Sequence, residues 1–572
     1  MNLSPDQKLT GLLAPLFCVR TANDLGIGDT ESLKELIDWS SDHGFSLVQI
    51  LPINETGGDN SPYNSISSLA VDPTTIATNP GALKDLSPLD FRKICSRHDV
   101  PGLRLGKVNY LGVRALKREL LEAAWKTFKA KHLKEQTRRA KIFKAWRKDH
   151  AAWLDSYTLF RALVRYHGEN ENMDLWPKQQ RTLVTAKKWL ASTRPLDRRK
   201  IRLLREFYAY VQWIAYGQWS ELKSYGDARQ VALMGDVPVG VSIYSADVFA
   251  QPELFDLSRS AGAPAEKVFA SDPFTMKWGQ NWGFPLYRWS EMAKDDYRWW
   301  RRRLRSTMDM FHFLRVDHAL GFFRIFSFPW RPQDNLEFLS LTEDEARTKA
   351  GGELPHFVPR DDSSPENMEM NRKQGDGLFR MMVEETGCHR LIAEDLGELS
   401  PYVRPALIEQ EIPGFKIPFW EMGPDGWPTP GRDYERLSLA TYATHDHPAL
   451  RTHWEGCYAD SQLEDPHRAK AGLRQLEEVC RFSEMNVPLP ARWSDQIHEA
   501  LLRGLLASNS WLAVSMITDL FGTEERFNVP GATGEENWTE RFPVPVAQWD
   551  SRWPDKLQRI KEMIKQSGRL PS

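Results

Sequence analysis

The chain has 572 residues, of which 41% are hydrophobic and 27% are charged, and its mean hydropathy is −0.51. These values are typical of a globular protein and exclude disordered, collagen-like and solenoid chains. The 75 Lys and Arg residues nearly balance the 77 Asp and Glu residues, which leaves a net charge of −2. Because nucleic-acid-binding proteins usually carry a basic excess, we expect no nucleic-acid partner.

The cysteines and the N-terminus bear on the cellular location. The five cysteines are scattered and form no C-x-x-C pair, so the sequence predicts neither a disulfide framework nor a zinc cluster. The N-terminus has no basic segment followed by an apolar core, and no run of roughly 18 apolar residues could cross a membrane. We therefore expect a cytoplasmic protein without a membrane partner.

Eight short apolar runs along the chain end in polar or charged residues. They cover residues 12–17, 47–53, 231–241, 313–318, 391–395, 415–420, 439–446 and 512–519. Nearly continuous runs of this length are typical of strands buried on both faces of a parallel sheet. Between most of them lies enough chain for a helix, such as residues 30–43, which carry an apolar stripe and precede Gly44, a suitable C-cap. The pattern predicts an α/β fold, a (β/α)8 TIM barrel.

The spacing of the runs is uneven. Roughly 175 residues separate the second run from the third, far more than one crossover helix needs. We therefore expect a large, mostly helical insertion between the second and third strands. The predicted division is 1–75 for the first part of the barrel, 76–200 for the insertion and 201–572 for the rest of the barrel.

Within that insertion, the sequence predicts long helices over residues 113–153. Residues 126–147 are strongly basic. We interpret them as a solvated helix face, with an anionic partner as the alternative.

The fourth run ends in Arg315-Val316-Asp317-His318. Residues two apart on a strand face the same side, so Arg315 and Asp317 are expected to project together. A guanidinium beside a carboxylate favours the ionised carboxylate, which a carboxylate nucleophile requires. A buried structural ion pair is the alternative interpretation.

Two adjacent acids, Glu394 and Asp395, close the fifth run. Because neighbours on a strand face opposite ways, only one of them can face the same pocket as Asp317. The other is expected to support the site from behind or to cap a helix.

Two further acids close other runs. The seventh ends in Thr444-His445-Asp446-His447, and the third contains Asp236 just before Pro238. The two histidines around Asp446 are compatible with a metal site, but the sequence shows no further matched ligand cluster. We therefore interpret Asp446 as another acid at the barrel mouth and expect no metal.

Several carboxylates at the mouth of a barrel are what glycosidic-bond chemistry requires. One carboxylate attacks the anomeric carbon, a second donates and recovers the proton, and the transition state is an oxocarbenium ion. The 22 tryptophans, about three times the average number, favour core packing when taken alone, with sugar stacking as the alternative. The sequence has neither a phosphate-binding glycine-rich loop nor a G-x-S-x-G elbow.

An ordered series of motifs resembles the 4-alpha-glucanotransferases (amylomaltases, or disproportionating enzymes) of glycoside hydrolase family 77 over nearly the whole chain. The matching segments are Ser61-Pro62-Tyr63, Gly235 to Pro238, Gln280, Trp282-Gly283, Pro285 to Tyr287, Arg315 to His318, Ala393 to Gly397, Pro413-Gly414, Lys416, Thr444 to Asp446, Arg526, Asn528, Pro530-Gly531 and Asn537-Trp538.

The resemblance implies a retaining enzyme that transfers α-1,4-glucan segments between maltooligosaccharides without a cofactor. By resemblance, Asp317 would be the nucleophile, Glu394 the general acid/base and Asp446 the transition-state stabiliser. The same comparison assigns Arg315, His445 and Asp236 to the reacting glucose, and Tyr63, Gln280 and Trp282 to neighbouring sugar sites. Retention requires the carboxyls of Asp317 and Glu394 to lie roughly 5–5.5 Å apart, and Glu394 needs a raised pKa to begin protonated. We expect a monomer or a weak homo-oligomer.

The chain departs from the family pattern near the site. His447-Pro448 follows Asp446, Tyr244 stands where the family usually has an acid, residues 262–269 replace the usual acceptor loop, and Phe284 replaces Asn after Trp-Gly. Such changes are expected to alter acceptor choice or water exclusion. The alternatives are therefore an α-glucan hydrolase, a transferase with an altered acceptor, or a non-catalytic glucan-binding homologue.

Overall fold

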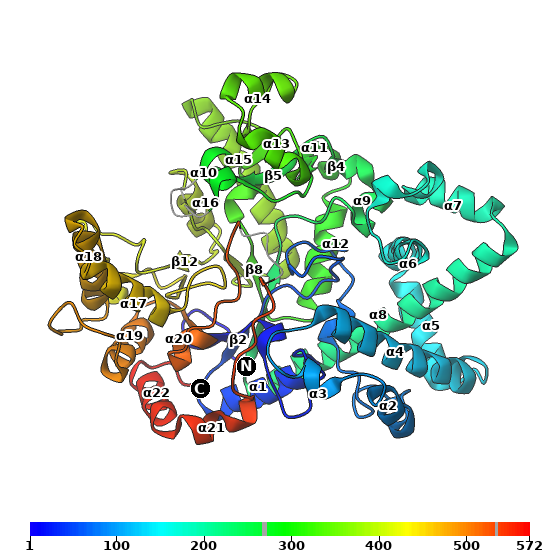
Figure 1. Ribbon diagram of the computed structural model, residues 1–572, viewed down its shortest axis with the longest axis horizontal. Coiled ribbons are helices and arrows are strands. Elements are labelled where there is room, and N and C mark those ends of the chain that lie inside the picture. The colour runs from blue at the N-terminus through cyan, green and yellow to red at the C-terminus, as the bar shows by residue number, and fades with distance from the viewer. Residues whose placement is uncertain (266–271, 398, 532–535, 572) are drawn as a thin grey trace.

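Eight parallel strands close into a barrel in the computed structural model, which describes residues 1–265, 272–397, 399–531 and 536–571 (Figure 1). The order around the barrel is β1-β14-β13-β12-β11-β8-β3-β2. The strands are β1 (Leu9–Leu13), β2 (Leu47–Gln49), β3 (Ala232–Val237), β8 (Phe313–Val316), β11 (Leu391–Ala393), β12 (Gly414–Lys416), β13 (Ser438–Ala440) and β14 (Leu512–Met516). The predicted (β/α)8 barrel is therefore confirmed, and each predicted run overlaps one barrel strand.

The predicted runs differ from the strands mainly at their ends. The first strand starts three residues before the predicted run, and residues 16–18 form a short 3-10 helix instead. Most other runs extend beyond their strands into the loops at the C-terminal ends, because the predicted runs include the polar residues that follow each strand. Those loops carry the polar residues discussed below.

Helix α1 (Thr30–Asp42) shows why these segments fold locally as predicted. Asp29 caps its N-terminus, since its side chain accepts from the backbone N–H groups of Glu31 and Ser32. At the other end Gly44 has a φ of 82°, a left-handed conformation that favours glycine. The buried stripe of the helix then faces the barrel.

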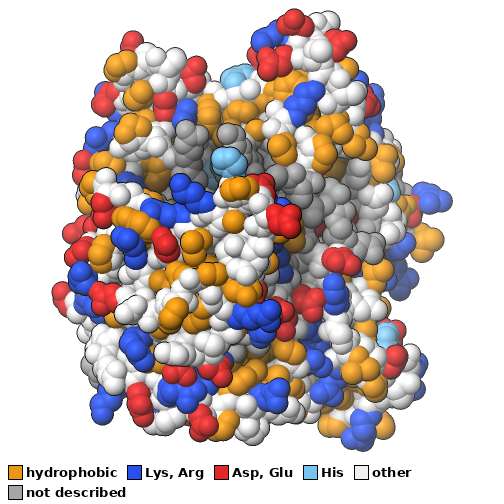
Figure 2. All heavy atoms as spheres, turned by 60° about the vertical axis from the view of Figure 1, so that its left-hand side comes forward, with side chains coloured by type: hydrophobic (Ala, Val, Ile, Leu, Met, Phe, Trp, Pro, Cys, Tyr) orange, Lys and Arg blue, Asp and Glu red, His pale blue; other side chains and the backbone are white. Residues whose placement is uncertain are grey.

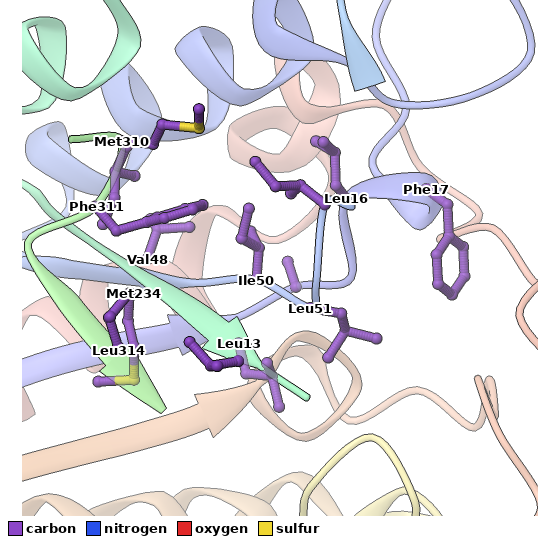
Figure 3. Packing of buried hydrophobic residues seen from close by; sticks show 14 of the residues in the cluster. Leu13, Leu16, Phe17, Val48, Ile50, Leu51, Met234, Met310, Phe311 and Leu314 are labelled. Carbon is purple, nitrogen blue, oxygen red and sulfur yellow. The ribbon is translucent and has the colours of Figure 1, made fainter. Parts of the chain in front are cut away.

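The apolar core is built from the barrel strands and the helices that cover them. Leu13, Val48, Met234 and Leu314 come from four different barrel strands, are all at most 3% exposed, and lie close together in Figure 3. Burying strands on both faces is the usual consequence of a parallel barrel surrounded by helices. This core fixes where each strand ends and therefore where the loop side chains begin.

The chain between β2 and β3 is mostly helical and occupies the right side of Figure 1. Its helices are α2 (Pro88–Cys95), α3 (Val100–Leu103), α4 (Tyr110–Phe128), α5 (Arg138–Asp149), α6 (Ala151–Tyr166), α7 (Leu183–Ser192) and α8 (Pro195–Arg229). The last of these is 35 residues long and runs through residue 200 before leading into β3. The division at residues 76 and 200 stays a prediction.

Two small antiparallel sheets were not predicted. One has the order β10-β9-β5-β6 and the other pairs β4 with β7. Their strands are β4 (Phe255–Asp256), β5 (Ser260–Ala263), β6 (Gln280–Asn281), β7 (Leu286–Tyr287), β9 (Ile325–Phe328) and β10 (His356–Val358). They are only two to four residues long, too short to produce a detectable alternation in the sequence.

Further helices follow β3 in the chain. They are α9 (Ala246–Ala250), α10 (Pro273–Trp278), α11 (Trp289–Ala293), α12 (Arg298–Met308), α13 (Asn335–Leu339), α14 (Glu343–Lys349), α15 (Pro365–Thr386), α16 (Val403–Glu409), α17 (Leu450–Ser461), α18 (Pro466–Phe482), α19 (Asp495–Ala507), α20 (Ile517–Phe521), α21 (Trp549–Arg552) and α22 (Pro554–Gln566). The two chain ends meet, since Gln7 Nε2 donates to the carbonyl of Leu570 at 3.1 Å.

The surface is mixed in charge. On the face seen in Figure 2, acidic and basic side chains are interspersed with apolar ones, in keeping with the near-neutral net charge. Within the described ranges, none of the helices has the length and apolar character needed to cross a membrane.

A buried cation joins the helical segment to the barrel, and its removal should destabilise the fold. Lys117 on α4 is 1% exposed. Its Nζ lies 3.1 Å from Asp29 Oδ2 and donates to the carbonyls of Thr74 and Ile76 at 2.7 and 2.8 Å. Lys117→Met leaves the Asp29 carboxylate buried without its cation, which should lower the free energy of unfolding by about 3–5 kcal/mol. We expect a clearly lower urea midpoint.

The matched control is Lys126→Met on the same helix, because Lys126 is exposed. Its free energy of unfolding should stay within about 0.5 kcal/mol of the wild-type value. Equal midpoints for the two variants would show that the buried contact of Lys117 does not stabilise the fold.

Candidate active site

The acids predicted from the sequence lie at the C-terminal ends of four barrel strands, three of which are consecutive in the barrel. Asp236 is in β3, Asp317 directly follows β8, Glu394 directly follows β11, and Asp446 lies in the loop after β13. Adjacent strands hold these residues in register, since Asp236 pairs with Arg315 and Ala393 with Val316. The barrel therefore brings the predicted residues to one mouth, where TIM barrels carry their active sites.

Arg315 is the centre of this cluster. Its Nη1 lies 2.6 Å from Asp236 Oδ2 and 3.1 Å from Asp317 Oδ1, and its Nη2 lies 3.8 Å from Glu394 Oε2. The side chain is 3% exposed. Arg315 and Asp317 therefore project to the same side. The guanidinium lies within 4 Å of three acidic side chains at once.

Asp317 has a second partner besides Arg315. The backbone N–H of Val239, in the loop after β3, donates to Asp317 Oδ2 at 3.3 Å. The two carboxylate oxygens are thus held from two strands, while the side chain keeps 18% of its surface exposed. A fixed, partly open carboxylate can reach a bound molecule.

Glu394 is held by the backbone of His318. The His318 N–H donates to Glu394 Oε2 at 2.8 Å, and His318 has a φ of 45°, in the left-handed region. This turn directs the amide towards the carboxyl. Burial raises the pKa of Glu394 to about 8, opposed by Arg315 and assisted by Asp317, so the group is largely protonated at neutral pH.

The neighbouring acid Asp395 has different partners. Its Oδ1 accepts from the backbone N–H of Phe415 at 2.7 Å, and its Oδ2 lies 3.2 Å from Arg404 Nε. Of the two adjacent acids, Glu394 is therefore the one that shares a pocket with Asp317. Asp395 ties β11 to β12 and α16.

Aromatic rings cover one side of Arg315. The Tyr63 hydroxyl donates to Asp236 Oδ2 at 2.7 Å, and its ring stacks on His445 with centroids 5.1 Å apart and planes at 16°. Trp538 lies against both rings, at 5.8 and 5.6 Å. Despite the hydrogen bond from Tyr63 and the charge of Arg315, burial raises the pKa of Asp236 to about 6.

Asp446 is the most exposed of the three candidate catalytic acids, at 38% of its side chain. Its Oδ1 accepts from Asn528 Nδ2 at 2.6 Å and lies 3.3 Å from His445 Nε2. Burial acts to raise its pKa, but its contacts with the His445 ring and with Asn528, together with the charge of Arg315, outweigh burial and lower the pKa. Asp446 is therefore ionised at neutral pH.

The histidines of the site are neutral. Burial lowers the pKa values of His318 and His445 to about 4. The metal alternative at the Thr444–His447 motif also lacks geometric support, since His445 Nε2 faces Asp446 whereas His447 Nδ1 contacts Thr444 Oγ1 at 2.8 Å. Across the part of the chain that the structure describes, no group of three or more His, Cys, Asp or Glu residues is placed to hold a metal ion.

Gln280 and Trp282 reach the site from the unpredicted four-stranded sheet. Gln280 is in β6, its Oε1 accepts from Trp282 Nε1 at 3.2 Å, and Trp282 packs edge-on against His318 with centroids 4.8 Å apart. Phe284 stacks on Trp282 at 5.6 Å and 24°. A partly exposed pair of aromatic rings therefore lies next to His318, the residue after Asp317.

The other departures from the family pattern have distinct surroundings. The Tyr244 hydroxyl donates to Asp174 Oδ2 at 3.1 Å, which connects the loop after β3 to the helical segment. His447 packs against the 48% exposed ring of Trp420, with centroids 5.2 Å apart. Of the altered acceptor loop, residues 266–269 lie outside the described residues.

Sequence reasoning did not assign three residues that the structure brings to this cluster. Asn528 contacts Asp446, Arg526 Nη2 donates to the Asp446 carbonyl at 3.2 Å, and Trp538 packs on Tyr63 and His445. All three lie in segments that match the family motifs. That match was the signal available for them, because their sequence distance from the strand ends gives no geometric indication.

Comparison with known proteins supplies the family. The sequence profile of the glycoside hydrolase 77 family, described as 4-alpha-glucanotransferase, matches residues 14–546. The 4-alpha-glucanotransferase of Chlamydia pneumoniae is 29% identical over 541 residues, covering 92% of this chain and 90% of its own length. That of Aquifex aeolicus is 28% identical over 538 residues, covering 92% and 93%.

Solved structures share the fold. An amylomaltase from Streptococcus agalactiae in complex with acarbose has a TM-score of 0.75 at 24% identity, over 99% of this chain and 100% of that one. Amylomaltase from Corynebacterium glutamicum has a TM-score of 0.76 at 20% identity, over 99% and 76%. Both likenesses span the barrel and the segments around it.

The raised pKa of Glu394 predicts that this group lowers stability in alkaline solution. In the unfolded chain a Glu has its ordinary pKa near 4.5, whereas in the fold the value is about 8. Between these two pH values the folded state binds more protons than the unfolded state, so stability falls as pH rises through this window. Glu394→Gln should remove the effect and raise stability at about pH 8.5 by about 2–4 kcal/mol.

The measurement is the denaturant midpoint of wild type and Glu394→Gln across that pH range. At about pH 4.5 the two midpoints should nearly coincide, and they should separate as pH rises. Glu464→Gln, at an exposed position, is the control and should follow the wild type throughout. A gap between Glu394→Gln and wild type that does not grow with pH would contradict the raised pKa.

Proposed function

Because the chain belongs to glycoside hydrolase family 77, the 4-alpha-glucanotransferases, we propose that it moves α-1,4-glucan segments between maltooligosaccharides through a covalent glucosyl-aspartate. The chain is a 4-alpha-glucanotransferase-type enzyme by family; the proposal concerns its mechanism and the roles of its residues. The observation that carries it is the pairing of one carboxyl that is protonated at neutral pH, Glu394, with Asp317 on the same guanidinium.

In the first step Asp317 acts as the nucleophile. One of its carboxylate oxygens forms a bond to the anomeric carbon while the bond from that carbon to the glycosidic oxygen breaks. Arg315 and the Val239 N–H support this role, because they hold the two oxygens of the carboxylate in place. The carboxylate stays partly open towards the mouth.

Glu394 is the general acid and then the general base. Its proton passes to the departing glycosidic oxygen, which leaves as a free 4-hydroxyl on the released segment. In the second step the Glu394 carboxylate takes the proton of an acceptor 4-hydroxyl, the acceptor oxygen bonds to the anomeric carbon, and Asp317 is released. A pKa of about 8 supports this cycle, because the group begins protonated.

Asp446 stabilises the positive charge that develops on the sugar ring. Its lowered pKa and its fixed position between His445 and Asn528 support a permanently ionised carboxylate there. We assign Arg315, His445 and Asp236 to the hydroxyls of the reacting glucose.

Three further residues line neighbouring sugar sites in this proposal. Tyr63 presents its ring beside His445, and Trp282 presents its ring beside Gln280. Aromatic faces stack on sugar rings, which supports this assignment. The acarbose bound by the Streptococcus agalactiae relative is consistent with an α-glucan groove at this mouth.

The first test is incubation of the protein with maltotriose and separation of the products by size. The wild type should produce a ladder of shorter and longer oligosaccharides. Asp317→Asn should lose this activity by about 10³-fold or more, because an amide cannot form the covalent intermediate.

Other product patterns would favour the alternatives. Glucose and maltose without longer products would indicate a hydrolase, and an unchanged maltotriose pool together with measurable glucan binding would indicate a binding homologue. A full ladder from Asp317→Asn would exclude Asp317 as the nucleophile.

A second test follows from the proton on Glu394. Because Glu394 must start protonated, kcat/KM for maltotriose should fall as pH rises through about 8, by about tenfold per pH unit beyond it. Glu394→Gln should lose about 10²–10⁴-fold with maltotriose. Fluoride needs no proton to leave, so the first-turnover release of fluoride from α-maltosyl fluoride, which precedes the step that needs Glu394 as a base, should be far less affected. An equal loss with both donors would contradict the acid role of Glu394.

A further inference from the structure

The loop that carries Asp446 is tied at its far end to a buried carboxylate outside the site described above. This loop leads into α17, whose N-cap residue Ala449 makes no side-chain cap. The backbone N–H of Leu450, the first residue of the helix, instead donates to Asp519 Oδ1 at 2.7 Å. Asp519 is in α20, directly after β14, so a carboxylate from the neighbouring strand caps α17.

The position of Asp519 is fixed by the barrel. Strand β14 pairs with β13, through Leu439 with Leu512, and the carbonyl of Asp519 accepts from His498 Nε2 at 2.7 Å. The His498 side chain is fully buried, and Asp519 is 2% exposed. Free N–H groups at a helix N-terminus attract a negative charge, so this contact determines where α17 begins.

The same segment also holds Asp446 directly. Asn528 Nδ2 donates to Asp446 Oδ1 at 2.6 Å, and Arg526 Nη2 donates to the Asp446 carbonyl at 3.2 Å. Arg451, next to Leu450, places its Nε 2.9 Å from Glu524 Oε1. Residues 519–528 therefore contact both ends of residues 446–451. Among these contacts, the one made by Asp519 is buried and lies at the start of a helix.

The stability of the fold alone does not account for a buried carboxyl group at Asp519. Burial raises its pKa to about 7, because only the Leu450 N–H offsets the loss of water. Within the described residues its second oxygen, Oδ2, has no hydrogen-bond partner. A buried carboxyl with one hydrogen bond contributes little net stability, which favours a role in placing the loop.

We propose that Asp519 is a positioning residue, which sets the location of Asp446 relative to the reacting sugar by capping α17. This inference rests on the proposed role of Asp446. A shift of about 1 Å in a charge that stabilises the transition state lowers the rate without a comparable change in substrate binding.

The first experiment compares two substitutions at Asp519. Asp519→Leu has a similar shape but no acceptor, and should lower kcat for maltotriose about tenfold or more while KM stays within about threefold. Asp519→Asn keeps an acceptor oxygen for the Leu450 N–H and should stay within about threefold of the wild type in kcat. Wild-type kcat in Asp519→Leu would overturn the proposal.

The second experiment tests whether Asp519 acts through Asp446. Fluoride release from α-maltosyl fluoride is measured for wild type, Asp519→Leu, Asp446→Asn and the double variant, because an activated donor leaves measurable residual rates. In the Asp446→Asn background, Asp519→Leu should change the residual rate by less than about twofold. An equal loss in both backgrounds would show a general effect on the fold and would overturn the proposal.

The Asp446→Asn variant distinguishes an error in the proposed function from an error in the positioning role of Asp519. If Asp446→Asn keeps wild-type activity, the role assigned to Asp446 is wrong. If Asp446→Asn is impaired while Asp519→Leu is not, only the positioning role is wrong.

A second pair of variants covers the case in which Asp519→Leu does not fold. Leu450→Pro removes the donor, since Pro lacks the N–H yet is well tolerated at the first position of a helix. Leu450→Val shortens the side chain similarly but keeps the N–H. Leu450→Pro should have a kcat about tenfold or more below that of Leu450→Val, and equal kcat values would overturn the proposal.

Discussion

The arrangement of the whole site depends on one buried guanidinium. Arg315 lies within 4 Å of three carboxylates, at 2.6 Å from Asp236, 3.1 Å from Asp317 and 3.8 Å from Glu394. Burial raises the pKa of an acid, and the charge of Arg315 opposes that effect. Glu394, the most distant of the three, has a pKa raised to about 8 by burial, which Arg315 only partly offsets at 3.8 Å. Burial therefore keeps a proton on Glu394 at neutral pH, although it shares a cation with two other acids.

The distances from Arg315 to the three acids depend on the register of the barrel strands. Asp236 and Arg315 are register partners on β3 and β8, and Glu394 directly follows β11, the other neighbour of β8. A slip of one residue in any of these pairings would turn the side chain to the opposite face of the sheet. The apolar core that fixes the register is therefore also what holds the charges at their distances. Tyr63 completes the cluster from the loop after β2.

The sequence predicted what depends on local patterns. The barrel strands were predictable because strands buried on both faces form continuous apolar runs, and Asp317, Glu394 and Asp446 were predictable because they end such runs. The roles of these acids came from family resemblance. The two small sheets were missed because their strands are too short for a periodic signal.

Contacts between residues that lie far apart in the sequence could not be predicted from local patterns. Asn528 lies 82 positions from Asp446, and Asp519 lies 69 positions from Leu450, yet each pair is joined by a hydrogen bond. Nothing in a window of sequence around either partner indicates these contacts. They arise because β13 and β14 are neighbours in the closed barrel, so the chain after β14 passes beside the loop after β13.

The exposure of the three acids affects whether water or a sugar hydroxyl can reach the site. The side chains of Asp317 and Glu394 are 18% and 15% exposed, whereas that of Asp446 is 38% exposed. A site that is open on the Asp446 side admits water unless a bound sugar covers it. The exposed ring of Trp420 lies beside His447, which follows Asp446, and the stacked rings of Trp282 and Phe284 lie beside His318. Aromatic rings stack on sugars, so these rings would favour an acceptor that is itself a sugar, and such an acceptor would both exclude water and complete the transfer.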